Sequence, residues 1–294
     1  KSMNGQMKNS ELILTPEGEI YHLRLRPGQL ADKIILVGDP GRVPMISQHF
    51  ERIEYTNQNR EICTHTGYYK GVRISAMSTG MGTDNIDIVL NELDALVNID
   101  FDLRAPRSQH HKLEMVRLGT SGALQKQITP GDFVVSSWGL GLDGLLNYYS
   151  GEKEKFSHEI AGDFITHSNW PESWATPYVV PASEKLFLRM GNGLPSGITA
   201  TAPGFYGPQG RLLRAGLLRD DMNEMLMSFD HNGLKVVNFE METSAIYGLC
   251  SLLGHEALTI CVAIANRATG DFLNDYHSRM EALVKHCLDN FIKE

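Results

Sequence analysis

Short runs of apolar residues that alternate with helical segments constrain the fold of this chain more than any other feature. The runs at 33–38 (KIILVG) and 257–267 (ALTICVAIANR) are apolar on both faces of a strand. Such strands are buried on both sides, which is typical of a parallel or mixed sheet with helices on each face. Further strands are predicted at 72–80, 114–124, 131–138, 196–202 and 235–239. The sequence therefore predicts an α/β fold.

Helical periodicity appears between several of these strands. Apolar residues from Ile86 to Val97 recur at intervals of three and four, and Asp84 is a suitable N-cap in front of them. A second helix is expected to reach about Leu253, with Gly254 at the C′ position. The last helix is predicted within 275–292, where the same spacing returns.

No break in composition separates two domains, although 294 residues would allow two. We expect one domain over 20–294. The polar start of the chain predicts a flexible tail over 1–19. Residues 101–114 and about 140–175 are expected to be polar loops or excursions on the same core.

Composition and charge exclude several classes of protein. A content of 42% apolar and 21% charged residues supports a sizeable core. The net charge of −8, without a basic block, disfavours nucleic acid as the main partner. There is no apolar run of the ~18 residues that a membrane span needs, and no signal-peptide pattern. The cysteines lack metal-site spacing and suggest reduced thiols in a cytoplasmic protein: Cys63, Cys250, Cys261 and Cys287.

Glycine-rich and polar stretches follow the predicted strands. They are GDPGR, STGMG, RLGTSG, NFEMET and ANR. In sheets of this kind ligands gather at the carboxyl ends of the strands. We therefore expect one site built from many loops.

Two of these loops contain an arginine suited to an anion. Arg42 follows a Gly-Asp-Pro-Gly turn, and Arg117 precedes a turn with Thr120 and Ser121. Guanidinium groups and turn amides suit phosphate oxygens. The alternative is that Arg42 caps a helix and Arg117 only ends a strand. Neither loop matches the nucleotide-binding GxxxxGK[ST] or GxGxxG patterns.

Glu240 and Glu242 stand at the end of the strand 235–239. They are candidates for an acid/base pair, for metal ligands or for binding hydroxyl groups. No His or Asp nearby has ligand spacing, so no metal is predicted. The alternative is that both carboxylates lie exposed in the first helical turn, where the helix dipole favours them.

The segment 204–211 (GFYGPQGR) holds an aromatic ring, an amide and a guanidinium in one loop. Phe205, Gln209 and Arg211 suit a planar heterocycle with a carbonyl and N–H edge. A surface turn with an aromatic anchor is the alternative. Taken alone, His22 and Arg60 are ordinary surface or core residues.

These motifs occur together and in order in one known family. VGDPGRV, STGMG, RLGTSGAL, GFYGPQGR, NFEMETSA and IANR resemble the uridine phosphorylases of the nucleoside phosphorylase superfamily. The resemblance runs from about Ile20 to the last helix. It implies a three-layer α/β/α sandwich around a mixed, partly barrel-like central sheet. It also implies a homo-oligomer, built from dimers that form a hexamer with shared active sites.

The resemblance further implies a role for each candidate residue. Inorganic phosphate would be bound by Gly38, Arg42, Arg117 and Thr120, and by Arg60 of a neighbouring subunit. Ribose would be held by Glu242, Met241 and Glu240, and by His22 of a neighbour. Uracil would be held by Phe205, Gln209, Arg211 and Arg267, while Arg211, Gln209, Glu242 and Arg117 would carry the catalysis.

The implied reaction is phosphorolysis of uridine, and possible further substrates are deoxyuridine and thymidine. It uses inorganic phosphate as co-substrate and no cofactor. Some members bind a monovalent cation through a glutamate and a serine; Glu61 matches the first, but Asn85 stands at the second position. The alternatives are a purine nucleoside phosphorylase, a related nucleosidase and a non-catalytic nucleoside-binding protein. The IANR segment lacks the aspartate of the purine enzymes, which favours pyrimidine.

Overall fold

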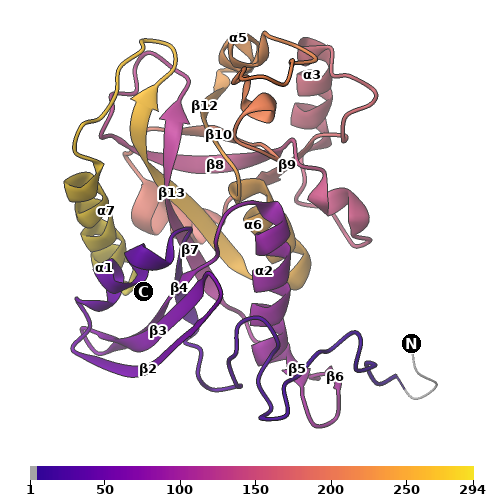
Figure 1. The fold of residues 1–294 in the computed structure, drawn as a ribbon, viewed down its shortest axis with the longest axis vertical. Helices are drawn as coiled ribbons and strands as arrows, with labels where there is room; N and C mark the ends of the chain where they lie inside the picture. Colours follow the sequence, from indigo (N-terminus) through magenta and orange to yellow (C-terminus); the bar gives the residue numbers. More distant parts are fainter. Residues whose placement is uncertain (1–4) are drawn as a thin grey trace.

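The computed structural model describes residues 5–294 and is built on one large mixed β-sheet with helices around it (Figure 1). The strands are β1 Lys33–Val37, β2 Arg52–Asn59, β3 Ile62–Tyr69, β4 Val72–Ser78, β5 Ile99–Asp100, β6 Ala105–Pro106, β7 Glu114–Ala123, β8 Phe133–Gly141, β9 Tyr178–Pro181, β10 Ser196–Thr201, β11 Asp230–His231, β12 Leu234–Glu240 and β13 Glu256–Asn266. The helices are α1 Val43–Ser47, α2 Thr83–Asn98, α3 His158–Ser168, α4 Glu184–Leu186, α5 Met222–Ser228, α6 Thr243–Leu253 and α7 Tyr276–Phe291.

Half of the sheet closes into a barrel-like ring. The ring order is β12, β10, β8, β13 and β7, and β7 pairs again with β12. The other half is open, and β1, β4, β3 and β2 continue outward from β7. Because β7 belongs to both halves, it brings the ends of β1, β12 and β13 together at one place.

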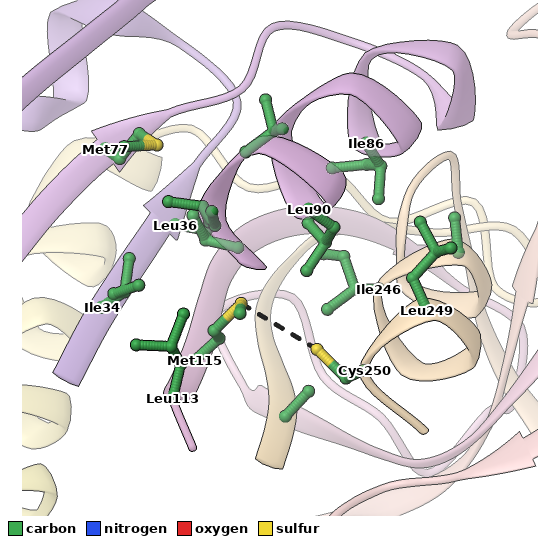
Figure 2. Close-up of a cluster of buried hydrophobic side chains, with 14 of the residues drawn as sticks. Ile34, Leu36, Met77, Ile86, Leu90, Leu113, Met115, Ile246, Leu249 and Cys250 are labelled. Atoms are coloured by element: carbon green, nitrogen blue, oxygen red, sulfur yellow. Dashed lines mark hydrogen bonds between the residues drawn. The ribbon is translucent and has the colours of Figure 1, made fainter. Parts of the chain in front are cut away.

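Helices cover both faces of the open half and give the three layers. On one face α2 packs against α6 in a cluster that includes Leu90 and Ile246 (Figure 2). On the other face α1 and α7 contribute Ile46 and Val284 to a second cluster. The predicted three-layer sandwich around a mixed, partly barrel-like sheet is confirmed.

The predicted strands and the predicted helices over 243–253 and 276–291 are present, with small shifts at their ends. Gly254 adopts a left-handed φ of 79° after α6, as expected for a C-terminal glycine. The predicted N-cap of α2 is wrong. The N-cap lies two residues earlier, at Gly82 with φ of 89°, and Asp84 lies inside the first turn of the helix. A left-handed conformation at Gly82 ends the preceding turn directly before the helix.

The prediction of loops over about 140–175 is also wrong in part, because the segment contains α3. Ser157 caps this helix by accepting a hydrogen bond from the Ile160 N–H. Ile160 and Phe164 point into a third apolar cluster shared with α5, which covers the barrel side. The helical pattern in the sequence is weak, because this helix has few buried apolar residues and polar residues stand between them.

Part of the expected tail makes contacts with the rest of the chain. Leu12 is buried, and Leu14 forms an isolated bridge with Ile20. The Arg104 side chain donates hydrogen bonds to the carbonyl groups of Met7 and Leu12. These contacts hold residues 7–12 against the 101–104 turn. Residues 1–4 of the expected tail lie outside the described part of the chain.

Two further sequence expectations concern the cysteines and the membrane. All four cysteines are buried and free. Within residues 5–294, no helix has the length and apolar character needed to cross a membrane.

Candidate functional site

A cavity of about 860 Å³ lies where the predicted site loops meet, at the carboxyl ends of β1, β4, β12 and β13. Eleven of the candidate residues line it: Gly38, Arg42, Arg117, Thr120, Phe205, Gln209, Arg211, Glu240, Met241, Glu242 and Arg267. The volume is typical of a small-molecule site. Residues far apart in the sequence therefore form one site, as the strand-end pattern predicts.

One end of the cavity carries Arg42 and the two glycine-rich loops. The Asp39 side chain accepts a hydrogen bond from the Gly41 N–H and so fixes the turn before Arg42. The Gly80 N–H donates to the Gly38 carbonyl at 2.9 Å, which holds the two loops together. The Arg42 Nε is buried, and none of the described residues accepts its hydrogen. This end therefore offers an unused guanidinium donor to an anion.

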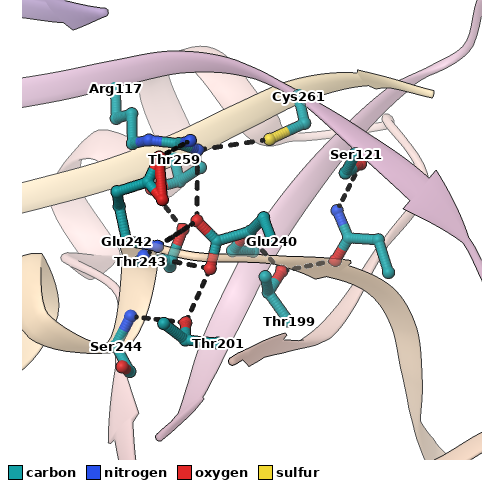
Figure 3. A network of polar contacts seen from close by, with 12 residues as sticks. Arg117, Ser121, Thr199, Thr201, Glu240, Glu242, Thr243, Ser244, Thr259 and Cys261 are labelled. Atoms are coloured by element: carbon teal, nitrogen blue, oxygen red, sulfur yellow. Dashed lines mark hydrogen bonds and ion pairs between the residues drawn. The ribbon is translucent and has the colours of Figure 1, made fainter. Parts of the chain in front are cut away.

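The middle of the cavity is built around Arg117 on β7 (Figure 3). Its guanidinium lies 2.9 Å from Glu242 Oε1 and 3.3 Å from Glu240 Oε2. A Cβ at Gly119 would lie 2.5 Å from Arg117 Nη1, so a glycine is needed there to make room for this side chain. All three charged groups are buried. A buried cluster of charges is stable only when its members are closely paired and form further hydrogen bonds.

The two glutamates differ in how far the protein already satisfies them. Glu240 accepts hydrogen bonds from the Thr201 hydroxyl and from the backbone N–H groups of Glu242 and Thr243. Glu242 accepts a hydrogen bond from Arg117 at its Oε1, and the Gly82 N–H lies close enough to the carboxyl to lower its pKa. Its Oε2 is buried, and no described residue donates a hydrogen bond of good geometry to it. Glu240 therefore supports the start of α6, while Glu242 presents a free acceptor to the cavity.

Burial and the neighbouring charges shift the pKa values of Arg117 and Glu242. Burial raises the pKa of the Glu242 carboxyl; Arg117 opposes this, and the negative charge of Glu240 adds to it. Burial alone would lower the pKa of Arg117, but Glu242 and Glu240 raise it above its usual value. Arg117 therefore stays charged. An extra donor at Glu242 Oε2 would stabilise the ionised carboxylate.

The other end of the cavity carries two arginines and an amide. The Arg211 guanidinium lies 3.8 Å from the centre of the Phe205 ring, and its Nη1 donates to Gln209 Oε1 at 2.8 Å. Arg267 Nη1 donates to the Gln209 carbonyl at 2.8 Å and to Asn223 Oδ1 at 3.0 Å. Gln209 Oε1 also accepts from Arg267 Nη2 at 3.4 Å, and Gln209 Nε2 donates to the Gly204 carbonyl at 3.1 Å, which orients its amide group.

No carboxylate pairs with either of these arginines in the described residues. Burial lowers the pKa of Arg211. Burial and the like charge of Arg211 lower the pKa of Arg267 to about 10, which leaves it charged at neutral pH. This end of the cavity is therefore positive and suits a planar group that carries or develops negative charge.

His22 and Arg60 lie outside the lining of this cavity. His22 is bound by Glu92 at 2.5 Å, and the Asn59 side chain donates to the His22 carbonyl at 2.8 Å. Arg60 follows in the exposed turn between β2 and β3, with φ of 52°. Both are close enough to Glu61, a cavity residue, to lower the pKa of its carboxyl, although hydrogen bonds from its own amide and from Asn85 are larger causes. They therefore lie beside the cavity, next to the Glu61 carboxylate that lines it.

The cation site implied by the resemblance does not fit these residues. Asn85 Nδ2 donates to Glu61 Oε1 at 2.9 Å and to the Thr79 carbonyl at 2.8 Å. The chain thus supplies the carboxylate with a hydrogen-bond donor in place of a second oxygen ligand.

A cluster that sequence spacing missed lies elsewhere. Asp94, His110 and His255 bring ligand atoms within 4.8 Å of one another. However, His255 Nδ1 accepts the Leu113 N–H, and its Nε2 donates to Asp94 at 2.8 Å. Both ring nitrogens are in use, so the cluster connects α2 and α6 to β7 rather than offering a metal site.

Sequence reasoning also missed Asn223, Thr201 and Phe272. Asn223 and Thr201 each bind a charged site residue, and Phe272 lines the cavity. Asn223 is on α5, a short helix without a strong pattern. No motif marks it, so only the folded structure reveals its contact with Arg267.

Several known proteins are similar to this chain over most of its length. The family model described as the phosphorylase superfamily matches residues 32–292. A uridine phosphorylase from Thermococcus kodakarensis is 32% identical and is matched over 90% of this chain and 83% of its own length. A DeoD-type purine nucleoside phosphorylase from Oceanobacillus iheyensis is 27% identical over 92% of this chain and 99% of its own length.

A solved structure of a nucleoside phosphorylase has the same fold as this chain. A Trypanosoma brucei nucleoside phosphorylase, described as showing uridine phosphorylase activity, superposes with a TM-score of 0.82. It is 30% identical, and the match covers 95% of this chain and 97% of that chain.

The different environments of the two glutamates predict different effects on stability. Glu240→Ala leaves two backbone N–H groups of α6 and the Thr201 hydroxyl without their acceptor. We expect it to lower the free energy of unfolding by about 3–5 kcal/mol. Glu242→Ala should cost clearly less, because it also removes the buried oxygen that has no partner. Urea denaturation measures both, with the exposed Glu159→Ala as control; an equal loss from both glutamates would contradict this assignment.

Proposed function

Because this chain belongs to the phosphorylase superfamily, we propose that it catalyses the phosphorolysis of uridine to uracil and ribose 1-phosphate. The observation that carries the proposal is the buried, unpartnered Oε2 of Glu242, placed between an arginine end and an arginine–glutamine end of one cavity. A ribose bound there supplies the missing hydrogen-bond donors through its 2′- and 3′-hydroxyls. The uridine phosphorylases among its relatives support this choice of substrate.

The reaction exchanges one bond at C1′ for another. The bond from C1′ to uracil N1 breaks and its electron pair leaves with uracil, which takes up a proton to become the neutral product, while a lone pair of a phosphate oxygen forms the new bond to C1′. Positive charge builds on the sugar, and the ionised Glu242 beside it is favourable there. Met241 packs beside the sugar, and Glu240 holds the start of α6 in place. Fixing the sugar in this way lowers the entropic part of the barrier.

Phosphate is assigned to the end with Gly38, Arg42 and Thr120, with Arg117 between phosphate and ribose. The unused Arg42 Nε is the donor that most favours an anion there. Uracil is assigned to Phe205, Gln209, Arg211 and Arg267. The two uncompensated guanidinium groups stabilise the negative charge on the departing base, and such preorganised donors contribute ~3–4 kcal/mol each.

The purine alternative is less well supported by the base end of the cavity. Asn266 stands where an acid would be required, and its side chain is fully engaged. Its Nδ2 donates to the Gln125 and Ile128 carbonyls, and its Oδ1 accepts the Ala268 and Thr269 N–H groups. It therefore has no free group for a purine ring nitrogen.

We assign His22 and Arg60 to a neighbouring subunit's site. The exposed Arg60 and the half-buried His22 lie beside the cavity rather than in its lining. A two-fold dimer would place these two residues of each subunit against the cavity of the other. The proposal includes one catalytic domain over 20–294, a cytoplasmic location, and dimers that assemble further into hexamers. It includes no cofactor and no nucleic-acid or membrane partner.

The direct test is incubation of the protein with uridine, with and without inorganic phosphate, followed by ultraviolet absorbance. We expect uracil only when phosphate is present. Equal turnover without phosphate would make the protein a nucleosidase. The absence of uracil in both reactions would contradict an enzymatic role on uridine and favour a binding protein. Inosine in parallel tests the purine alternative.

Glu242→Ala is expected to lower kcat/KM for uridine by roughly 10²–10³-fold, since it removes the carboxylate that orients and stabilises the sugar. The fold should remain intact by circular dichroism. Glu159→Ala, an exposed carboxylate on α3, is the matched control and should leave the rate unchanged. Near-normal kinetics of Glu242→Ala would refute its ribose role.

Shared active sites predict rescue between two inactive variants. Arg60→Ala and Glu242→Ala, co-expressed in equal amounts, form some sites with an intact Glu242 and an intact neighbouring Arg60. Random assembly should then restore about a quarter of the wild-type activity. A mixed preparation that is no more active than the mean of the two separate variants would place Arg60 outside any shared site.

A further inference from the structure

A second cavity, of about 360 Å³, lies behind the base end of the first one. Its lining includes Leu142, Asp143, Trp170, Trp174, Arg219 and Met222. The proposed active-site residues are absent from this lining. The two cavities are separated by the 207–209 turn. Gly207 and Pro208 line the second cavity, and Gln209 lines the first. The volume falls within the range of small-molecule sites.

Two indole rings form part of the wall. Trp170 and Trp174 meet edge to face with ring centres 4.9 Å apart. Trp170 Nε1 donates to the Ala175 carbonyl at 2.9 Å, so its polar atom is already satisfied. What the indoles offer a ligand is therefore their aromatic surface, and the indole face is the best aromatic partner for a cation.

Asp143 gives the same cavity a carboxylate. It accepts hydrogen bonds from the Tyr178 and Ser244 hydroxyls and from the Leu145 N–H. No cation forms an ion pair with it in the described part of the chain. Burial raises the pKa of Asp143, whereas these hydrogen bonds lower it. A largely buried carboxylate is stabilised further by an opposite charge.

The other charged residue of the wall is already paired. Arg219 binds both carboxylate oxygens of Asp221, at 2.7 and 2.8 Å, and donates to the Ser168 carbonyl. Its charge is therefore balanced locally. Asp143 is left as the group that selects the charge of a ligand.

We propose that this cavity binds a small organic cation with an aromatic or other apolar body. The cationic group pairs with Asp143, and the body packs on Trp170 and Trp174. The apolar wall excludes a fully hydrated inorganic ion, while the carboxylate disfavours an anion. This site goes beyond the proposed reaction and does not depend on it.

Hydrogen bonds connect the site to the first cavity. Asp143 accepts a hydrogen bond from the Ser244 hydroxyl. The Ser244 N–H donates to Thr201 Oγ1, and the Thr201 hydroxyl donates to Glu240 (Figure 3). Glu240 in turn pairs with Arg117. A cation at Asp143 therefore acts on the centre of the active site through two intervening residues. Any such effect is reciprocal: ligands of the first cavity change the affinity of the second.

The test uses phenyltrimethylammonium as the cation and tert-butylbenzene as its neutral equivalent of the same shape. Titrations of the full-length protein follow tryptophan fluorescence and heat. We expect saturable 1:1 binding of the cation per chain, and at least about tenfold weaker binding of the neutral compound. Saturating uridine and phosphate should shift the affinity without abolishing binding. Simple competition by uridine would place the probe in the first cavity and overturn the proposal.

Substitutions locate the site. Asp143→Asn should weaken the cation about tenfold or more and leave the neutral compound unchanged, while Trp170→Leu should weaken both. Asp163→Asn, an exposed carboxylate on α3, is the matched control and should change neither. Equal affinity for cation and neutral compound, or cation binding that is unaffected by either cavity variant, would refute the proposal. If Asp143→Asn fails to fold, Trp170→Leu still decides. Binding needs no turnover, so this result is independent of the uridine assay.

Discussion

The buried contact of Arg117 with Glu240 and Glu242 is the interaction on which the rest of the site depends. Arg117 comes from β7, the strand shared by the ring and the open half of the sheet, and the glutamates come from the end of β12. One positive and two negative charges leave the cluster with an excess negative charge. The N–H groups at the start of α6 offset part of it through Glu240. Glu242 Oε2 has no hydrogen bond of good geometry among the described residues, so the free protein keeps an acceptor that a ligand can satisfy.

This excess sets the charge order along the cavity. Arg42 stands at one end, the glutamates in the middle, and Arg211 and Arg267 at the other end. The protein charges along the cavity are therefore positive, negative and positive. The reacting ligands carry the complementary charges: negative on phosphate, positive on the sugar and negative on the departing base. The match explains why the chain leaves Arg42 Nε and Glu242 Oε2 without partners, although both are buried. Buried groups without a hydrogen-bond partner lower the stability of the free protein. The lost free energy is regained when the ligand supplies the missing hydrogen bonds.

The sequence could predict those parts of the site that stand at strand ends. Arg117 and Glu242 follow apolar runs, and the folding of such runs into one sheet is enough to bring them together. Asn223 and Asp143 could not be predicted, because their roles come from contacts with residues 44 and 101 positions away. The helix α3 was missed because its apolar face is only a few residues wide. The contacts of Arg104 with residues 7–12 likewise exist only in the folded chain.

The two ends of the cavity also differ in how they are built. Arg117, Thr120 and Glu240 lie on strands of the ring, where Arg117 pairs with both β1 and β13, Thr120 with β13 and Glu240 with β10, and this pairing fixes the backbone. The base end lies on the 204–211 loop, followed by the exposed leucines Leu212, Leu213 and Leu218. A loop accepts substitutions that a ring strand does not. Sugar and phosphate chemistry can therefore stay constant while base preference changes, which accounts for relatives of both pyrimidine and purine type around one fold. In this chain the engaged Asn266 and the uncompensated arginines Arg211 and Arg267 favour the pyrimidine assignment that we propose.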